Sequence, residues 1–485
     1  HDHEQGDLHL LQPTMNLAKI HAWDLVGAVL AALVLRAFYR LYLHPLARIP
    51  GPKMTAITSL YELYYNVVCD GRFIFRIEEM HKKYVHIIDP DFYDEIYTSS
   101  VRKRDKEPTF VPTFGVPYAA VATVKHDVHR YRRSLLYEFF SRRSVSRLSP
   151  VIEERVGKLM SRLVEFHVGG EVVDLCGAFG ALTSDVITFC CYGKSWGFLE
   201  DPDFRSDIRT AANDFAGVPP QVMAVLMPGK SALFEFQRSI FEHFSAVVAG
   251  QRITLTGGGG ITIIKRLTSE AIPPSERTLS RLQDEGFTLI VAGTETTMRS
   301  FAFAANYVFQ GYMVRERLRA ELRQVLPTPT STATWEELEK LPYLRLFGCR
   351  AWHQMKSYYN EHVIPPGYEP SLQTPMSTSI YFVHHNPVIS PDPHNFNPER
   401  WFKASEDFNL RKYLVPFTKG SRKCVGVNLV IMEIYLTVAT YVRRFVLEIQ
   451  SVDPGNIRVA RDRVVGFPET GTLQICAKVK STIQV

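Results

Sequence analysis

The chain has 485 residues, 46% of them hydrophobic and 22% charged, and its formal net charge is +6. Such a balance excludes a disordered chain, and so modest a charge argues against a dedicated nucleic-acid-binding protein. The seven cysteines are odd in number, widely spaced and free of any CxxC pair, which argues against a disulfide framework or a structural zinc site and favours a reducing compartment.

The N-terminal part contains an apolar segment, residues 20–43, that is long enough to cross a bilayer. Its uninterrupted run, LVGAVLAALVL, is followed by Arg36 and Arg40, whose long side chains can extend to the membrane interface. Because these arginines, Arg48 and Lys53 all lie after the run, the positive-inside tendency predicts a cytoplasmic main domain. A cleaved signal peptide is disfavoured for the same reason, since its basic residues would precede the run. We therefore predict one membrane anchor helix.

The next segment, residues 44–52, is rich in proline and is predicted to be a hinge, because prolines block continuation of a helix. No repeat or long linker divides the rest of the chain, so residues 53–485 are predicted to form one domain. Residues 1–14 precede Met15 and are predicted to be an N-terminal extension that is no part of the natural product.

Three features stand out before the middle of the chain. His129 and Arg133 have the i,i+4 spacing that puts two side chains on one helix face. The basic residues between Arg130 and Arg143 form either a solvated helix face or a surface that docks an acidic partner. The apolar segment Phe215–Met227 either dips into the membrane or is buried.

Residues 284–309 have helical periodicity and contain the motif AGTETT, from Ala292 to Thr297. A glycine and three threonines weaken a helix, which predicts a local opening that oxygen and water could enter. The alternative is that the polar side chains bond back to preceding backbone carbonyls.

The segment Phe417–Gly426, FTKGSRKCVG, contains the cysteine that carries most of the functional argument. Its two glycines, Gly420 and Gly426, permit tight turns and close approach of a flat ligand. Arg422 and Lys423 are expected to favour the thiolate of Cys424, as is the N-terminus of the apolar helix predicted over residues 427–445. One cysteine excludes tetrahedral zinc locally, whereas a single axial thiolate suits haem iron.

This segment resembles the haem-binding loop of the cytochrome P450 superfamily at Phe417, Gly420, Arg422, Cys424 and Gly426. The AGTETT motif resembles the oxygen-activating helix of that family, and LPYL (341–344) and NPERW (397–401) resemble two of its other motifs. The resemblance implies the cytochrome P450 fold, mainly α with a smaller β-rich part (α+β), behind the anchor helix. It is closest to fungal members of secondary metabolism, of the terpenoid and trichothecene type.

The resemblance also implies a role for each candidate residue. Cys424 would be the axial metal ligand of the haem, with Phe417 and Gly426 as further cofactor-binding residues of its loop. His129, Arg133 and Arg422 would contact the haem propionates. Glu295 and Thr296 would be the catalytic acid–alcohol pair that delivers protons to oxygen. The substrate would be lined by residues 111–124, by Ala292 and by residues 464–468.

The implied activity is hydroxylation or epoxidation of a lipophilic small molecule. It would use O2 and electrons from NADPH-cytochrome P450 reductase, at the cytoplasmic face of the endoplasmic reticulum membrane, in a single-pass protein. The basic residues between Arg130 and Arg143 and between Lys419 and Lys423 would help to dock the reductase.

The chain departs from the family where a glutamate and an arginine are expected after LPYL. Arg350 and His353 stand there instead, so Arg400 would face another cation, and the loss of a partner in such a network costs about 3–5 kcal/mol. The chain is also short near residues 83–86 and 353–363. These departures favour a haem-binding pseudoenzyme, an impaired paralogue or a misassembled gene. A further alternative is a haem-thiolate isomerase or dehydratase that needs no reductase.

Overall fold

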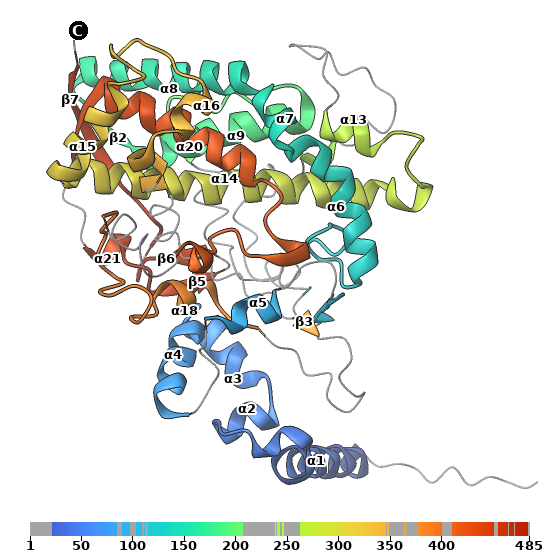
Figure 1. The fold of residues 1–485 in the computed structure, drawn as a ribbon. Helices are drawn as coiled ribbons and strands as arrows, with labels where there is room; N and C mark the ends of the chain where they lie inside the picture. Colours follow the sequence, from blue (N-terminus) through green and yellow to red (C-terminus); the bar gives the residue numbers. More distant parts are fainter. Residues whose placement is uncertain are drawn as a thin grey trace, which may run out of the picture. The chain divides into compact units, whose positions relative to one another are not determined.

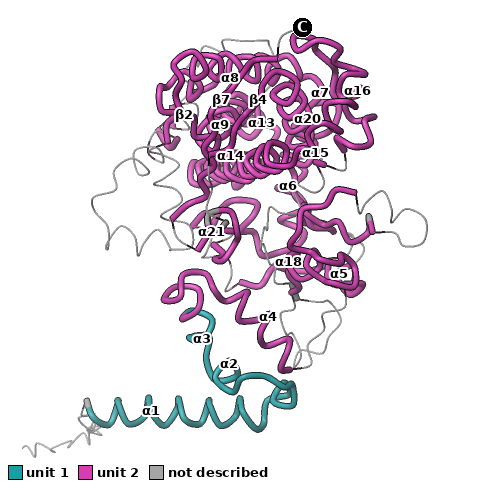
Figure 2. The backbone as a smooth tube through the Cα atoms, turned by 90° about the vertical axis from the view of Figure 1, so that its left-hand side faces the viewer, with its two compact units in different colours: residues 1–63 teal, residues 64–485 magenta. Residues whose placement is uncertain are grey.

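The computed structural model describes residues 22–84, 90–97, 103–108, 111, 115–206, 238, 240–242, 245–246, 262–345, 347–348, 363–364, 377–399, 410–450, 454–463, 465–469 and 471–483. The chain divides into two compact units, residues 1–63 and 64–485 (Figure 2).

The first unit contains the apolar helix that the sequence predicts. Helix α1 (Ala22–Phe38) continues into a π-helical turn (Tyr39–Leu43). The stretch Trp23–Leu43 is apolar and long enough to cross a membrane, and none of it is buried within the protein. The structure therefore confirms an N-terminal apolar helix of the kind that anchors a protein in a membrane.

The predicted hinge begins with a short helix of its own. His44 is extended, as a residue before proline usually is, and its ring nitrogen accepts from the Leu46 amide at the start of a 3₁₀ turn (Pro45–Arg48). Pro45 thus ends one helix and starts the next, because its fixed φ suits the first helical position. Short helices α2 (Lys53–Ile57) and α3 (Leu60–Leu63) complete the unit.

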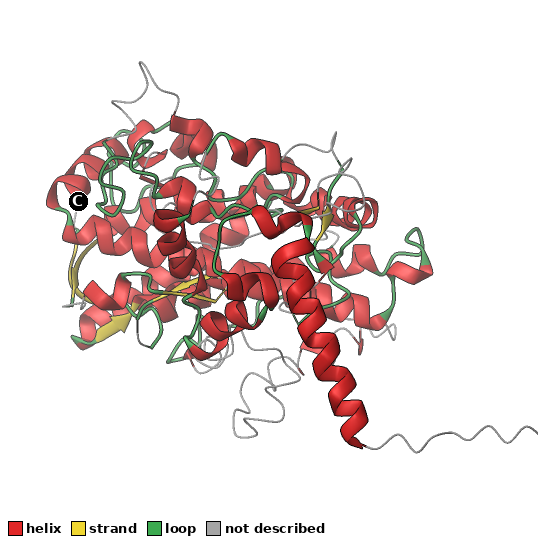
Figure 3. Cartoon of the chain, turned by 90° about the horizontal axis from the view of Figure 1, so that it is seen from below, coloured by secondary structure: helices red, strands yellow, loops and turns green. Residues whose placement is uncertain are grey.

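The second unit is mainly helical, with few strands (Figures 1 and 3). Its core is formed by α8 (Ser149–Gly169), α9 (Leu175–Tyr192), α14 (Leu279–Gln310) and α20 (Val427–Arg444), which pack against one another. Helix α9 is apolar on all sides and almost entirely buried. It therefore belongs to the core of the domain, although its length and composition would also suit a membrane span.

The shorter helices of this unit surround that core. They are α4 (Phe73–Lys83), α5 (Phe92–Ile96), α6 (His126–Phe140), α7 (Arg142–Ser146), α13 (Ile263–Leu267), α15 (Tyr312–Leu322), α16 (Trp335–Glu339), α18 (Ile380–His384) and α21 (Pro454–Ile457).

Among the described residues the strands form three small antiparallel sheets. Strand β7 (Cys476–Thr482) lies between β2 (Val172–Asp174) and β4 (Phe445–Ile449). The other pairs are β1 (Asp105–Lys106) with β3 (Val363–Ile364), and β5 (Arg461–Arg463) with β6 (Val465–Phe467). This confirms the predicted mainly α fold with a smaller β part.

Helix α14 runs unbroken through the AGTETT motif, so the predicted local opening is wrong. Gly293 serves close packing instead: a Cβ there would lie 2.8 Å from Cγ1 of Ile187 on α9. Thr294 faces the same helix, since its hydroxyl lies 3.1 Å from the Ser184 hydroxyl and its carbonyl accepts from Thr183. The weak helix formers of the motif therefore allow two core helices to approach closely.

Replacing Gly293 by alanine is expected to destabilise the protein by about 1–3 kcal/mol, because the added methyl group overpacks the contact with Ile187. The matched control is Gly157→Ala on α8, where an added Cβ meets nothing within 4 Å. That change should stabilise the helix by about 0.5–1 kcal/mol. Urea denaturation measures both effects, and equal stabilisation by the two alanines would contradict this account of Gly293.

Candidate functional site

The loop before α20 folds back on itself and presents Cys424. The Cys424 amide donates to the Phe417 carbonyl at 2.9 Å, and the turn between them passes through positive φ at Thr418 and Gly420. Gly420 is thus required by the backbone, because glycine adopts a positive φ without strain. Gly426 does not, since its φ is −84°, but a Cβ there would meet nothing within 4 Å. The open space beside Gly426 suits the close approach of a flat ligand.

The Cys424 side chain is exposed, yet the surrounding protein desolvates its sulfur and raises the pKa of the thiol. The sulfur is therefore accessible to a ligand but is surrounded by protein atoms that keep much of the bulk water away. The Gly426 amide and Arg133 lower the pKa, but by less than burial raises it. That Arg422 and Lys423 favour the thiolate stays a prediction. The charge of a bound metal ion would stabilise a thiolate at this position.

The three residues predicted to contact the haem propionates come together near this loop. Arg133, on α6, donates from Nη2 to the Cys424 carbonyl at 3.5 Å. His129, one turn earlier on α6, is buried, and its pKa is lowered to about 2 by burial and by the charges of Arg422 and Arg133. The guanidinium of Arg422 donates to the backbone carbonyls of residues 123–124.

Buried imidazole nitrogens lie near the two arginines. Both ring nitrogens of His126 and Nδ1 of His129 are buried and have no hydrogen-bond partner within the part of the chain that the structure describes. A buried polar atom without a partner destabilises a protein, so such atoms usually mark the place of a ligand or water. Together with Arg133 and Arg422, these nitrogens form a place suited to the carboxylates of a ligand.

The middle of α14 is exposed on one side although the helix crosses the core. Val291 is 38% exposed and Ala292 is also exposed, whereas Thr297 to Ser300 are buried. The Thr296 hydroxyl donates to the Ala292 carbonyl at 2.8 Å. For Thr296 the structure thus confirms the alternative that the side chain bonds back to its own helix, which leaves its oxygen able to accept a further hydrogen bond.

Glu295 pairs with Arg299, a residue that was not among the site residues predicted from the sequence. Its Oε1 accepts from Nε of Arg299 at 2.7 Å and forms an ion pair with Nη2 of the same guanidinium at 2.7 Å. Arg299 is almost wholly buried, donates to the Gly466 carbonyl at 2.5 Å, and lies 4.5 Å from the ring centre of Phe467. The Glu–Arg i,i+4 spacing on α14 was the signal available in the sequence. Arg299 therefore joins the predicted catalytic acid to β6, which lies in the segment predicted to line the substrate.

Comparison with known proteins places this chain in a family. A sequence profile described as "Cytochrome P450" matches residues 58–472. The chain is 37% identical over 496 residues to cytochrome P450 monooxygenase aflU of Aspergillus parasiticus, and the match covers 94% of this chain and 97% of that protein.

The chain belongs to the cytochrome P450 family.

Other fungal P450 proteins are similarly related. Cytochrome P450 monooxygenase TRI4 of Fusarium sporotrichioides is 37% identical over 511 residues, covering 96% of each chain. Conidiogenone synthase PchP450 of Penicillium rubens is 37% identical over 469 residues, covering 89% of this chain and 93% of that protein. The crystal structure of the cytochrome P450DA heme domain shares the fold, with a TM-score of 0.63 and 16% identity over 82% of this chain and 88% of that one.

P450 proteins hold a haem through an axial thiolate, and the residues of this chain fit that group. Cys424 supplies the only cysteine of its loop, the space beside Gly426 is open, and the buried nitrogens of His126 and His129 lie with Arg133 and Arg422 where carboxylates would be bound. The family uses O2, a redox partner and a lipophilic substrate.

Several predicted features lie outside the described residues. They are residues 1–14, 20–21, 85–86, 112–114 and 354–362, the segment Phe215–Met227, Arg350, His353, Arg400, and residues 401 and 464. The LPYL motif is described, and a helix begins at its Pro342. Glu321 of α15 accepts from the amides of Tyr343 and Leu344, at 2.7 and 2.8 Å, and so caps that helix.

The buried His129 predicts a pH dependence of folding in the protein freed of haem. Its pKa is about 2 in the fold and about 6.5 in an unfolded chain, so protons bind the unfolded state preferentially. Stability is therefore fully present above pH 6.5 and falls by up to about 1.4 kcal/mol per pH unit below it. His129→Phe should remove this slope in urea denaturation measured from pH 7 to pH 5. An unchanged slope would show that His129 is protonated in the fold.

Proposed function

We propose that this P450 protein is a haem-dependent monooxygenase that hydroxylates or epoxidises a lipophilic small molecule, a terpenoid or another secondary metabolite. The observation that supports it most is the exposed side chain of Cys424 beside Arg133, Arg422 and the neutral, buried His129. A relative named conidiogenone synthase supports the secondary-metabolite class.

In this proposal the cysteine loop and α6 hold the haem. Cys424 would hold the haem through its thiolate, and Phe417 fixes the position of Cys424 by accepting the hydrogen bond of its amide. His129, Arg133 and Arg422 bind the propionates, and the open side of Gly426 admits the flat ring. When bound, the haem supplies the iron at which oxygen is activated.

Glu295 and Thr296 move protons on the other side of the site. The Thr296 hydroxyl donates its hydrogen to the Ala292 carbonyl, so the lone pairs of its oxygen can accept a hydrogen bond from a proton donor. Glu295, held by Arg299, takes protons from solvent and passes them on.

The partners agree with the same proposal. Electrons come from NADPH-cytochrome P450 reductase, which docks on the basic residues between Arg130 and Arg143 and between Lys419 and Lys423. The helix over Trp23–Leu43 anchors the protein in the endoplasmic reticulum membrane, with the catalytic domain in the cytoplasm.

A second candidate function is haem binding without turnover. The presence of Arg350 and His353 where the family has a Glu–Arg pair favours it, because Arg400 would then lack its carboxylate partner.

The test is NADPH-dependent oxidation of a panel of apolar terpenes by the full chain with a fungal reductase. Thr296→Ala should lower product formed per NADPH by about 100-fold, since proton delivery contributes on this order. The matched control is Thr288→Ala, whose hydroxyl bonds the Asp284 carbonyl at 2.7 Å in the same way two turns earlier. A haem spectrum without any product would favour the second candidate, and product without NADPH would favour an isomerase or dehydratase.

A further inference from the structure

A short apolar loop, residues 115–124, lies between β1 and α6 and carries no charged side chain. Several of its side chains are buried, namely Val116, Ala119, Ala120 and Ala122. The loop belongs to no helix or strand, and the backbone hydrogen bonds within it are local, each from an amide to the carbonyl three residues earlier. Its path must therefore be fixed by groups outside the loop.

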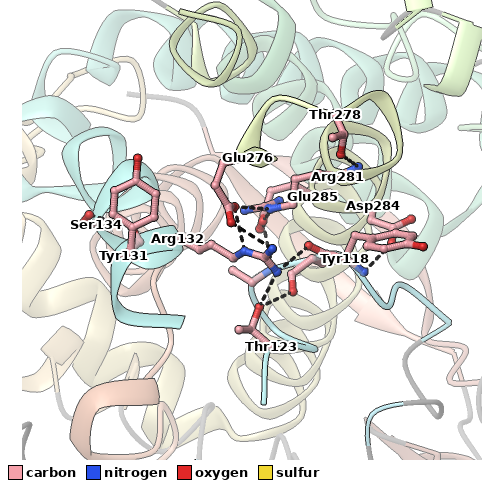
Figure 4. A network of polar contacts seen from close by, with 12 residues as sticks. Tyr118, Thr123, Tyr131, Arg132, Ser134, Glu276, Thr278, Arg281, Asp284 and Glu285 are labelled. Carbon is pink, nitrogen blue, oxygen red and sulfur yellow. Dashed lines mark hydrogen bonds and ion pairs between the residues drawn. The ribbon is translucent and has the colours of Figure 1, made fainter. Parts of the chain in front are cut away.

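Two carboxylates of α14 bind the loop backbone from one side (Figure 4). Glu285 accepts from the Ala120 amide at 3.0 Å, and the next residue back, Asp284, accepts from the Tyr118 amide at 2.9 Å. These bonds tie the loop to the same helix that carries Glu295 and Thr296.

Cations bind the loop carbonyls from the other side. Arg132 of α6 donates from Nη1 to the Tyr118 carbonyl at 3.1 Å and to the Thr123 hydroxyl at 2.9 Å. Arg422, in the cysteine loop, donates to the carbonyls of Thr123 and Val124 at 2.9 and 2.8 Å. Lys106 of β1 also contributes, since it donates to the Val121 carbonyl at 2.7 Å. Charged side chains from separate segments thus hold an uncharged loop.

The charges that hold the loop are themselves held in an alternating row. Arg132 pairs with Glu276 at 2.8 Å, Glu276 with Arg281 at 3.4 Å, and Arg281 with Glu285. Figure 4 shows this row lying between α6 and α14. The Arg281 and Glu285 side chains are 3% and 2% exposed. Each buried charge has an opposite neighbour, so the row gives the loop a fixed support.

We infer that Arg132 and Asp284 are positioning residues that fix the shape of residues 115–124 and thereby limit the size of the molecule that reaches the haem. The inference rests on the proposed function, in which this loop lines the substrate. A hydrogen bond to a charged group contributes about 1.5–3 kcal/mol, so losing one raises the open fraction of the loop by about 10- to 100-fold.

The experiment uses the full chain with haem and the variants Asp284→Ala and Arg132→Lys. Neither leaves a buried charge without a partner, because Asp284 is half-buried and lysine keeps the charge that faces Glu276. Amide hydrogen exchange is measured over residues 116–124. Spectral titrations are then made with two haem ligands, imidazole, which is small, and clotrimazole, which is bulky and apolar. The matched control is Gln283→Ala, whose side chain bonds the Phe241 carbonyl and not the loop.

Both variants should speed exchange in residues 116–124 by at least about 10-fold and strengthen clotrimazole binding by a similar factor, because a loop that opens more often admits the bulky ligand, with imidazole binding and the control unchanged. Unchanged exchange in the loop would overturn the inference. So would a rise spread equally over α8 and α9, because that would show loss of global stability. A wild-type chain without a haem spectrum would refute the proposed function alone, since loop exchange is measured independently of it.

Discussion

Replacing Cys424 by serine is expected to abolish thiolate-ligated haem and to leave the fold intact. The hydrogen bond that holds residue 424 in the loop is made by its backbone amide, which donates to the Phe417 carbonyl. Serine keeps this amide and therefore this bond. The Cys424 side chain is exposed within the fold, so the small change creates no cavity. A neutral hydroxyl supplies no thiolate to the iron. The measurement is the reduced carbon monoxide spectrum together with the circular dichroism of the variant.

Cys69→Ser is the control, because that thiol lies outside the cysteine loop and is only partly buried. It should keep the wild-type spectrum. A Cys424→Ser protein with the full thiolate-type band would show that another cysteine ligates the haem.

Replacing Arg299 by leucine is expected to destabilise the protein by about 3–5 kcal/mol, because it removes one partner of an ion pair inside the fold. The side chains of Arg299 and Glu295 are 2% and 18% exposed, so water can compensate little for the loss. The bond from Arg299 to the Gly466 carbonyl is lost as well, which leaves a buried acceptor. Urea denaturation measures the change.

The pair itself is tested by the double variant Glu295→Gln with Arg299→Leu. If the cost arises from an isolated carboxylate, the double variant should recover at least about 1 kcal/mol relative to Arg299→Leu alone. Arg299→Lys, which keeps the charge but cannot make all the bonds, should lie between the wild type and leucine. Strict additivity of the two changes would show that Glu295 and Arg299 do not interact.

The long helices of the fold could be predicted from the sequence because their signals are local. The helix expected over residues 427–445 is α20, Val427–Arg444, and its basic end is fixed by bonds from Arg443 to the carbonyls of Leu326 and Pro327. The helix expected over residues 284–309 begins earlier, at Leu279, because the Thr278 side chain accepts from the Arg281 amide. Periodicity detects the apolar face of a helix but not a polar first turn.

The site was predictable in its residue types and less so in its electrostatics. Spacing alone placed His129 and Arg133 on one face, but it could not show that Arg422 turns toward the carbonyls of residues 123–124. Burial of the Cys424 sulfur, which raises its pKa, is also a property of the folded chain and not of the adjacent sequence. The same holds for the role of Gly293, which depends on Ile187, a residue far away in the chain.

The central claim, that Cys424 holds a haem in this chain, is tested most directly by the carbon monoxide difference spectrum of the reduced full-length protein in microsomes. The account predicts a Soret band at the position of thiolate-ligated haem, despite Arg350 and His353. No band, or only the band of a haem whose thiolate has been displaced, would contradict it.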